Sequence, residues 1–295
     1  MKIVVTGATG FIGRHVLQTL LKQGHDILVV GRTEPHESGK YRFIQSNLLE
    51  KDSHAWLVEY RPSHLMHLAW YAEHGKFWTS HINLEWCDAT IRLVKSFCEA
   101  GGKKVVVAGS CAEYDWSIGY CKENSTPTNP STLYGITKDC TRRMLEELCK
   151  SYNTSLSWGR VFLPFGVGEN PNKLIPSIAQ ALVGKRPSFS VNSQQWRDFL
   201  PVENVADSLI HLLNRDVSGI FNLSSGRPTQ ICDLVNHIAE VLNQDPSLIL
   251  FNDRIEQNQS NFLVGDNTSL FSIGWSPTYD LWERLDYYVN TVVSV

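Results

Sequence analysis

The chain has 295 residues, of which 42% are hydrophobic and 19% charged, a composition typical of a globular protein with one large domain or two modest ones. Its formal net charge of -3 gives no reason to expect nucleic acid or an anionic membrane as a partner. Its seven cysteines are scattered without a CxxC pair, which argues for a reducing compartment and against a disulfide framework or a zinc site.

The first half of the chain alternates between short β-branched runs and amphipathic stretches. We expect strands at residues 2–6, 27–30, 42–45, 64–68, 103–108 and 155–161, and helices at residues 11–23, 79–100 and 133–150. This alternation predicts the α/β class, with a doubly wound parallel sheet. In such sheets ligands bind at the carboxyl ends of the strands.

The pattern loosens after residue 163, where glycine, proline and asparagine cluster. We therefore expect residues 1–163 to form a dinucleotide-binding domain, and residues 164–295 to form mostly a smaller domain that binds the substrate. A helix at 202–213 and a strand at 219–223 are expected to return to the main sheet, within a segment near 199–225.

A glycine-rich turn joins the first strand to the first helix. Gly7, Gly10 and Gly13 are spaced so that the first allows a tight turn, the second lets the backbone approach a pyrophosphate, and the third lets helix and strand pack closely. The helix amino terminus offers N–H groups and a positive dipole to the phosphates. The residues expected to contact the dinucleotide here are Gly7, Thr9, Gly10, Phe11, Ile12, Gly13 and Arg14.

The end of the second strand indicates which dinucleotide is bound. An NAD-preferring protein usually carries an acidic residue there for the ribose hydroxyls, whereas this chain has Gly31 followed by Arg32. A guanidinium pairs bidentately with a 2′-phosphate, and Arg14 is placed to assist. We therefore favour NADP(H) as the cofactor and keep NAD(H) as the alternative.

Tyr134 and Lys138 lie four residues apart in a predicted helix and therefore share one face. A nearby ammonium stabilises a tyrosinate, so we expect Lys138 to lower the pKa of Tyr134 and make it a usable acid or base. Ser110 follows the predicted strand at 103–108, at the sheet edge where a nicotinamide would lie, and its hydroxyl can polarise a substrate carbonyl. These three side chains are the candidate catalytic residues.

Several further motifs follow in order along the chain. They are His67-Leu68-Ala69, Asn83, Gln195-Trp196-Arg197-Asp198-Phe199 and Val264-Gly265-Asp266-Asn267. Together with the glycine turn and the three candidate catalytic residues, they resemble the extended short-chain dehydrogenase/reductase family of nucleotide-sugar-modifying enzymes (the NAD-dependent epimerase/dehydratase family). The resemblance covers nearly the whole chain and implies a Rossmann fold.

The resemblance also implies roles for particular residues. Ser110 and Tyr134 would flank the reacting carbonyl of a nucleotide-diphosphate sugar, while Lys138, with Tyr134 beside it, would hold the cofactor ribose. The other residues implied to lie near the cofactor are Asn47, Leu48, Leu68, Ala69 and Asn83. For Asn83 the alternative is a helix residue bonded to the backbone, and His67 is expected to be a packed structural histidine.

Two basic residues are candidates for the substrate diphosphate. The planar guanidinium of Arg197 matches phosphate oxygens, and the resemblance points to the same role; the alternative is an ion pair with Asp198 or Glu203. Lys173, at a predicted helix start, could neutralise the same phosphates, or it could be a solvated lysine. The segment 73–81 could also touch the sugar.

The residues after Ser110 reduce the number of reactions that the enzyme is expected to catalyse. Family members that act as 4,6-dehydratases carry acid/base carboxylates where this chain has Cys111 and Ala112, and Glu113, on a strand-like segment, would point to the other side. We therefore expect no dehydratase. The stretch from Gly109 to Trp116 also resembles bacterial synthases that make CDP-dideoxyhexoses by 4-keto reduction, which implies deoxysugar biosynthesis of the kind that serves lipopolysaccharide.

The candidate reaction is therefore NADPH-dependent reduction of a nucleotide-linked 4-keto-6-deoxy sugar, with hydride delivered to C4 and a proton from Tyr134. The alternative is an NAD-dependent nucleotide-sugar 4-epimerase, which uses the same three residues. A remote alternative is a regulatory NAD(P)-binding protein without catalysis, against which the intact catalytic residues argue. The resemblance further implies a homodimer formed through the helices at 79–100 and 133–150.

The location and the metal content can also be predicted. No apolar run reaches the length of a membrane span, and the amino terminus reads as a strand rather than a signal peptide, so we expect a cytoplasmic protein without a membrane partner. His74 and His81 lack a third ligand at a suitable spacing, so no metal is expected.

Overall fold

The computed structural model describes residues 1–51, 54–252 and 260–294. The chain divides into two compact units. The first contains Met1–Tyr114, Thr128–Val161 and Val205–Phe221, and the second contains Asp115–Pro127, Phe162–Asn204 and Asn222–Val295. Both units are therefore built from segments that are separated in the sequence.

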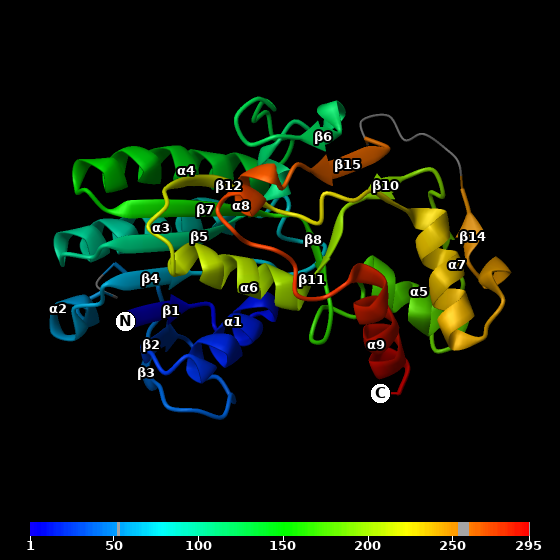
Figure 1. Cartoon of the computed structure of the whole chain (residues 1–295), viewed down its shortest axis with the longest axis horizontal. Helices are drawn as coiled ribbons and strands as arrows, with labels where there is room; N and C mark the ends of the chain where they lie inside the picture. Colours follow the sequence, from blue (N-terminus) through cyan, green and yellow to red (C-terminus); the bar gives the residue numbers. More distant parts are fainter. Residues whose placement is uncertain (52–53, 253–259, 295) are drawn as a thin grey trace. The chain divides into compact units, whose positions relative to one another are not determined.

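A seven-stranded sheet runs through the first unit (Figure 1). Its strands, in spatial order, are β12 (Gly219–Leu223), β7 (Ser155–Val161), β5 (Lys104–Ser110), β4 (His64–His67), β1 (Lys2–Thr6), β2 (Asp26–Gly31) and β3 (Arg42–Gln45). The pairings from β3 through β2, β1, β4 and β5 to β7 are all parallel. The strand order reverses between β1 and β4, as in the Rossmann arrangement, and this confirms the predicted fold class.

Helices cover both faces of this sheet. α3 (Ile82–Glu99) and α4 (Leu133–Ser151) lie on one face, and α1 (Phe11–Lys22) and α6 (Val202–Leu213) on the other, while the short α2 (Trp56–Tyr60) precedes β4 (Figure 1). Because both faces are covered, strands such as β1 and β2 are nearly continuous runs of buried aliphatic residues. Leu93, Phe97 and Trp158 belong to the core on the α3 and α4 side.

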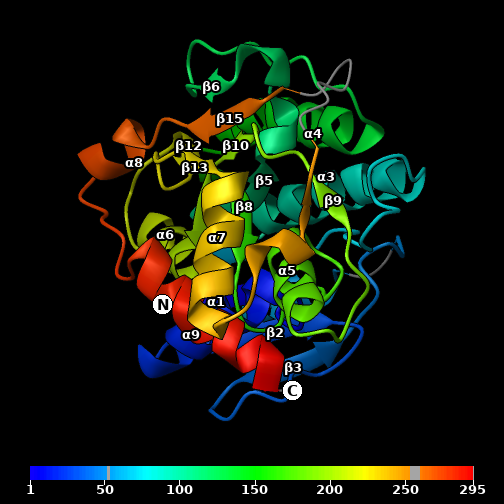
Figure 2. The ribbon, with the colours of Figure 1, turned by 90° about the vertical axis from the view of Figure 1, so that its right-hand side faces the viewer.

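Short strands and three main helices build the second unit (Figure 2). Its small sheets pair β13 (Thr229–Gln230), β10 (Trp196–Arg197), β15 (Phe262–Gly265) and β6 (Tyr120–Cys121) in that order, β11 (Phe199–Pro201) with β8 (Leu163–Phe165), and β14 (Leu250–Phe251) with β9 (Ser190–Val191). The helices are α5 (Leu174–Leu182), α7 (Ile231–Leu242) and α9 (Leu281–Ser294), with the shorter α8 (Thr268–Ser272), η2 (Trp116–Ile118) and η3 (Pro246–Leu248). α5, α7 and α9 pack on one another around Ile178, Ile238 and Leu285.

The predicted elements agree closely with the observed ones. The helix expected at 79–100 is α3 at 82–99, and the strand expected at 103–108 is β5 at 104–110. The short strands of the second unit, such as β6 and β15, were not predicted one by one, since two to four residues carry no readable period.

Among the described residues, no helix is both long and apolar enough to cross a membrane, and no group of three His, Cys, Asp or Glu is placed to hold a metal ion.

Candidate active site

The turn between β1 and α1 has the backbone geometry of a phosphate-binding loop. Gly7 has a φ of 73°, a left-handed conformation that favours glycine, and its carbonyl oxygen accepts a hydrogen bond from Gly10 N at 3.0 Å. A Cβ at Gly13 would lie 2.0 Å from the Gly7 oxygen, so α1 packs on the turn only because residue 13 is glycine. A Cβ at Gly7 would lie 2.5 Å from Ala69 N and 2.6 Å from Leu68 C, which places Leu68 and Ala69 beside the turn.

The start of α1 is suited to an anion. Gly10 is the N-cap, no side chain caps the helix, and no acidic residue occupies its first turn. Thr9 and Gly10 are exposed, while Phe11, Ile12 and Arg14 are half-buried. A helix start without a side-chain cap or a carboxylate leaves its dipole available to a phosphate group. The turn therefore fits the pyrophosphate of a dinucleotide.

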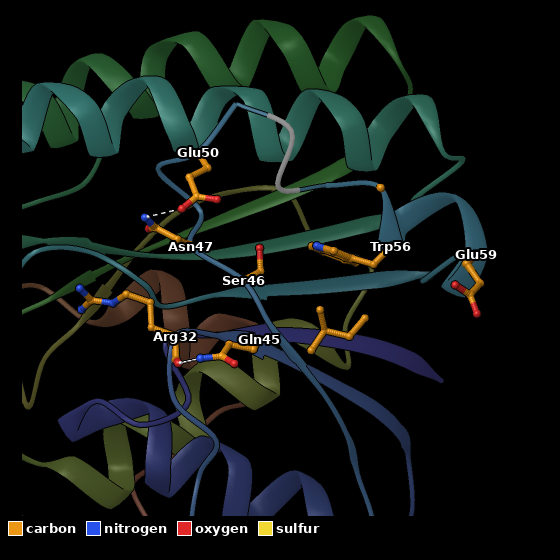
Figure 3. A pocket seen from close by; sticks show the side chains of 9 residues that line it. Arg32, Gln45, Ser46, Asn47, Glu50, Trp56 and Glu59 are labelled. Atoms are coloured by element: carbon orange, nitrogen blue, oxygen red, sulfur yellow. Dashed lines mark hydrogen bonds between the residues drawn. The ribbon is translucent and has the colours of Figure 1, made fainter.

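A cavity of about 710 Å³ opens past the carboxyl ends of β2 and β3 (Figure 3). Its lining residues are Arg32, Ile44, Gln45, Ser46, Asn47, Glu50, Ala55, Trp56 and Glu59. Arg32 is exposed, and its carbonyl oxygen accepts a hydrogen bond from Gln45 Nε2 at 3.1 Å. Asn47 Nδ2 donates to Glu50 Oε1 at 3.3 Å. Arg32 and Asn47, both expected near the adenosine half of the cofactor, thus line one cavity, whereas Leu48 is buried in the core.

The carboxyl end of β5 and the first turn of α4 meet at the candidate catalytic residues. Ser110 is the last residue of β5, and its side chain is hydrogen-bonded to that of Tyr134 on α4. One turn later on α4, Lys138 Nζ donates to the carbonyl oxygen of Ala108 in β5 at 2.8 Å. The structure therefore brings Ser110, Tyr134 and Lys138 together.

Close backbone packing makes this approach possible. A 3-10 helix, η1 (Cys111–Glu113), follows Ser110, whose Oγ accepts a hydrogen bond from Ala112 N at 3.2 Å. A Cβ at Gly135 would lie 2.2 Å from the carbonyl oxygen of Ala112. The glycine that follows Tyr134 is therefore what allows α4 to approach η1.

Lys138 is almost fully buried, with 3% of its surface exposed. Its Nζ lies 3.9 Å from the centroid of the Trp70 ring but 6.0 Å from that of Tyr134. Burial lowers the pKa of Lys138 to about 7, and the carboxylate of Glu113 offsets part of this effect. The ammonium is thus directed to the end of β5 and to Trp70.

The expected lowering of the Tyr134 pKa is wrong. Burial raises the pKa of Tyr134 above its ordinary value, Glu113 and Cys111 add to the rise, and the hydrogen bond with Ser110 opposes it. The ammonium of Lys138 does not compensate, because it points to Ala108 rather than to the phenol. Tyr134 is therefore held as a neutral phenol, which can donate a proton.

Aromatic side chains from the segment after β4 surround Tyr134. The rings of Phe77 and Trp78 meet the Tyr134 ring edge-on, with centroids 4.8 Å and 5.7 Å away. Tyr134 N also donates to the carbonyl oxygen of Trp78 at 3.1 Å. Trp70 was missed as a site residue, whereas Phe77 and Trp78 lie in the segment 73–81 that was expected near the sugar; the available signal for Trp70 was an aromatic-rich segment directly after a strand of the sheet.

Asn83 is engaged inside the first unit. Its Nδ2 donates to the carbonyl oxygens of Phe77 and Ser80 at 2.7 Å and 2.8 Å, and its Oδ1 accepts from Trp70 Nε1 at 2.8 Å. These contacts use the polar groups of the amide. Asn83 therefore positions Trp70, the ring next to Lys138, and fits the alternative of a helix residue bonded to the backbone.

His67 is a packed structural residue, as expected. Its Nδ1 lies 2.7 Å from Thr6 Oγ1 and its Nε2 lies 2.9 Å from Thr90 Oγ1. Burial lowers the pKa of His67 to about 3, and Lys138 adds to the effect. The imidazole is therefore neutral in the folded protein at ordinary pH.

Glu113 lies on η1 and not on a strand, so the expectation of a strand-like segment there is wrong. Its carboxylate is fully buried and accepts hydrogen bonds from Ser110 N at 2.8 Å, Trp158 Nε1 at 2.9 Å and Arg160 Nε at 2.8 Å. These donors occupy the carboxylate, which agrees with the expectation that Glu113 does not serve as a dehydratase acid.

Lys173 and Arg197 belong to the second unit. Lys173 is the N-cap of α5, with Nζ 4.0 Å from Glu169 Oε2. Arg197 ends β10, and its Nη1 donates to the carbonyl oxygen of Trp196 at 2.9 Å. Of the alternative partners for Arg197, Asp198 accepts hydrogen bonds from the backbone N–H groups of Ser225, Gly226 and Gly265, and Glu203 pairs with Arg284.

The glycine turn after β1, with Ser110 at the end of β5 and with Tyr134 and Lys138 beside it on α4, is the arrangement of an oxidoreductase of the extended short-chain dehydrogenase/reductase type. Residues 3–224 match the model of the NAD dependent epimerase/dehydratase family, and the chain belongs to this family. The resemblance drawn from the motifs is thereby confirmed.

Known relatives act on nucleotide sugars. The dTDP-6-deoxy-L-talose 4-dehydrogenase (NAD(+)) of Aggregatibacter actinomycetemcomitans is 29% identical over 238 residues, which cover 78% of this chain and 87% of the relative. The UDP-glucose 4-epimerase of Neisseria meningitidis serogroup C is 25% identical over 278 residues, covering 79% of this chain and 80% of the relative. The solved structure of MoeE5 in complex with UDP-glucuronic acid and NAD has a TM-score of 0.86 at 26% identity and covers 100% of both chains.

Proposed function

We propose that this enzyme reduces the 4-keto group of a nucleotide-linked 4-keto-6-deoxy sugar, with NADPH as the reductant. The observation that carries the proposal is the hydrogen-bonded pair of Ser110 and the neutral phenol of Tyr134, followed by Cys111 and Ala112 in place of carboxylates. The site therefore holds an acid for a carbonyl oxygen without the second acid that water elimination requires. A relative named as a 6-deoxy-sugar 4-dehydrogenase supports chemistry at the same carbon.

The residues act by orienting the ketone and supplying one proton. The hydride for the carbonyl carbon would come from a reduced nicotinamide when this cofactor is bound. Tyr134 donates its phenolic proton to the carbonyl oxygen, so the ketone becomes a secondary alcohol, and its raised pKa keeps that proton in place at neutral pH. Ser110 holds the same oxygen by a hydrogen bond, and Lys138 would bind the ribose of the cofactor.

The choice of NADPH rests on Arg32. Its guanidinium is exposed at the end of β2 beside the cavity of Figure 3, where a 2′-phosphate would be received. NAD remains the alternative, because NAD occurs in the MoeE5 complex and in the name of the talose dehydrogenase. Arg32→Ala should weaken NADPH binding about tenfold and leave NADH binding within about twofold, as measured by fluorescence titration. Equal losses for both cofactors would point to NAD as the natural cofactor.

Arg197 and Lys173 would bind the diphosphate of the substrate. A homodimer through α3 and α4 is supported by exposed apolar side chains on these helices, namely Leu84, Ile136 and Met144. None of the seven cysteines, all of which lie among the described residues, forms a disulfide, which supports a reducing compartment such as the cytoplasm.

The test is to mix the purified protein with NADPH, and separately with NADH, and a panel of nucleotide-linked 4-keto-6-deoxy sugars while following cofactor absorbance. Stoichiometric loss of NADPH that disappears in Tyr134→Phe is the expected result. No net consumption with any keto sugar would reject the reductase.

A nucleotide-sugar 4-epimerase is the second candidate. It is favoured by the UDP-glucose 4-epimerase of Neisseria meningitidis among the relatives and by the fact that it needs the same Ser110, Tyr134 and Lys138. Interconversion of ordinary nucleotide sugars by NAD-loaded protein, with no net cofactor turnover, would establish it in place of the reductase.

A further inference from the structure

A buried ion pair that the mechanism above does not use lies next to Ser110. Glu113 is 0% exposed and Arg160, on β7, is 1% exposed, with Arg160 Nε 2.8 Å from Glu113 Oε2. Removing two charges from water is costly, and their mutual attraction compensates only where the geometry is good and further hydrogen bonds are made.

The carboxylate of Glu113 connects the end of β5 to β7. It accepts hydrogen bonds from Ser110 N at 2.8 Å and from Trp158 Nε1 at 2.9 Å, and Ser110 and Glu113 form a capping box at the start of η1. A Cβ at Gly109 would lie 2.1 Å from Trp158 Nε1 and 2.7 Å from Glu113 Oε1. The glycine before the catalytic serine thus leaves room for this carboxylate.

Arg160 connects the pair to the catalytic helix. Its guanidinium carbon lies 4.2 Å from the centroid of the Tyr114 ring, and its Nη2 lies 3.8 Å from Asp139 Oδ1. Asp139 follows Lys138 on α4 and also pairs with Arg142 at 2.7 Å. One network of charges therefore joins the strand that carries the serine to the helix that carries the tyrosine and the lysine.

We propose that Glu113 is a positioning residue for proton transfer: held by Arg160, its carboxylate fixes the backbone of Ser110 so that the serine hydroxyl keeps its hydrogen bond with Tyr134. The charge opposes a tyrosinate and favours an ammonium, and accordingly Glu113 raises the pKa of Tyr134 and of Lys138. Both effects suit an enzyme that gives a proton to a ketone, so the inference rests on the proposed reduction.

The first test compares Glu113→Gln with Glu146→Gln. Glu146 belongs to the same network, 2.7 Å from Arg142, but its side chain is 40% exposed, so it is a matched control for the loss of one negative charge. In Glu113→Gln we expect kcat for keto-sugar reduction to fall about tenfold. The alkaline limb of the pH profile, which is the decline of kcat at high pH, should begin about one pH unit lower than in the wild type, while the Kd for NADPH stays unchanged. Glu146→Gln should keep both kcat and the limb. An unshifted limb in Glu113→Gln would overturn the proposal.

A second variant guards against simple misfolding, because Glu113→Gln leaves Arg160 buried without its partner. The double variant Glu113→Met with Arg160→Met removes both charges, and apolar replacement of a buried ion pair usually preserves the fold. If the pair is only structural, the folded double variant regains wild-type kcat and pH profile. If Glu113 positions Ser110, the double variant folds but keeps the low kcat and the shifted limb.

A measurement without turnover separates this inference from the proposed function. In protein labelled with 15N-serine, the Ser110 amide, assigned with Ser110→Ala, should resonate downfield because it donates to a carboxylate, and it should move upfield in Glu113→Gln. An unmoved Ser110 resonance would overturn the positioning role even if the enzyme reduces keto sugars. If the resonance moves but the wild-type protein reduces no keto sugar, the reductase fails while the contact stands.

Discussion

The ammonium of Lys138 lies over the face of Trp70, 3.9 Å from the ring centroid, while it donates a hydrogen bond to the carbonyl oxygen of Ala108. Asn83 accepts a hydrogen bond from the Trp70 indole at 2.8 Å and so holds the ring in place. A cation on an aromatic face is stabilised most where water is excluded, as it is around the buried Lys138. Trp70 therefore helps to hold the Lys138 side chain in place.

This relationship predicts the effect of Trp70 substitutions. Trp70→Leu removes the aromatic face and should lower kcat/KM by about 5- to 30-fold, the equivalent of about 1–2 kcal/mol, whereas Trp70→Phe should lose less because it keeps a ring. Trp86→Leu is the matched control, since Trp86 packs beside Trp70. Steady-state kinetics of the three variants would decide, and equal losses in Trp70→Phe and Trp70→Leu would contradict a role for the ring face.

The buried ammonium of Lys138 should also cost stability. Its pKa in the folded protein, about 7, lies below the ordinary value of 10.5, so between these values the unfolded chain binds the proton more tightly and the wild type gains stability as pH rises. Lys138→Met removes the buried charge and should be inactive yet more stable than the wild type at about pH 6, by on the order of 2–5 kcal/mol. Urea unfolding should show this difference shrinking toward about pH 9.5. A variant that is less stable at every pH would refute the buried-charge cost.

His67 should make the fold sensitive to acid. Its pKa of about 3 in the folded protein lies below the ordinary 6.5, so as pH falls through this window only the unfolded chain takes up the proton, and stability is lost. His67→Gln cannot be protonated and should lose stability less steeply below about pH 6.5, by on the order of 1.4 kcal/mol per pH unit. The exposed His36, changed to glutamine, is the control. Parallel acid unfolding curves for wild type and His67→Gln would contradict this assignment.

Two glycines of the turn between β1 and α1 should differ in role: Gly13 is needed for folding and Gly10 for cofactor binding. A Cβ at Gly13 would lie 2.0 Å from the Gly7 carbonyl oxygen, so Gly13→Ala should lower the free energy of unfolding by about 1–3 kcal/mol and abolish cofactor binding. At Gly10 the corresponding distance is 3.2 Å, which a small shift relieves, so Gly10→Ala should keep its stability but bind the cofactor more weakly. Thermal unfolding and calorimetric titration measure the two effects. Equal stability of both variants would show that α1 packs differently.

Much of the fold and part of the candidate site could be predicted because their signals are local. The alternating strands and helices from β1 to β7 have readable periods, and a doubly wound sheet then places Ser110 at a carboxyl edge. The spacing of Tyr134 and Lys138 and the glycines of the first turn are equally local. The short strands β6 and β15 lack such a period, and their pairing depends on residues far apart in the sequence.

The sequence by itself identified part of the candidate site: the glycine turn, Arg32, Ser110, Tyr134 and Lys138. Only the tertiary structure decided their states. In the folded protein, Lys138 points to Ala108 and Trp70, and the pKa of Tyr134 is raised rather than lowered. The Asn83 amide holds Trp70, and Glu113 forms an ion pair with Arg160. The physical reason is that a pKa depends on burial and on the charges nearby, and these are set by packing between residues distant in the chain.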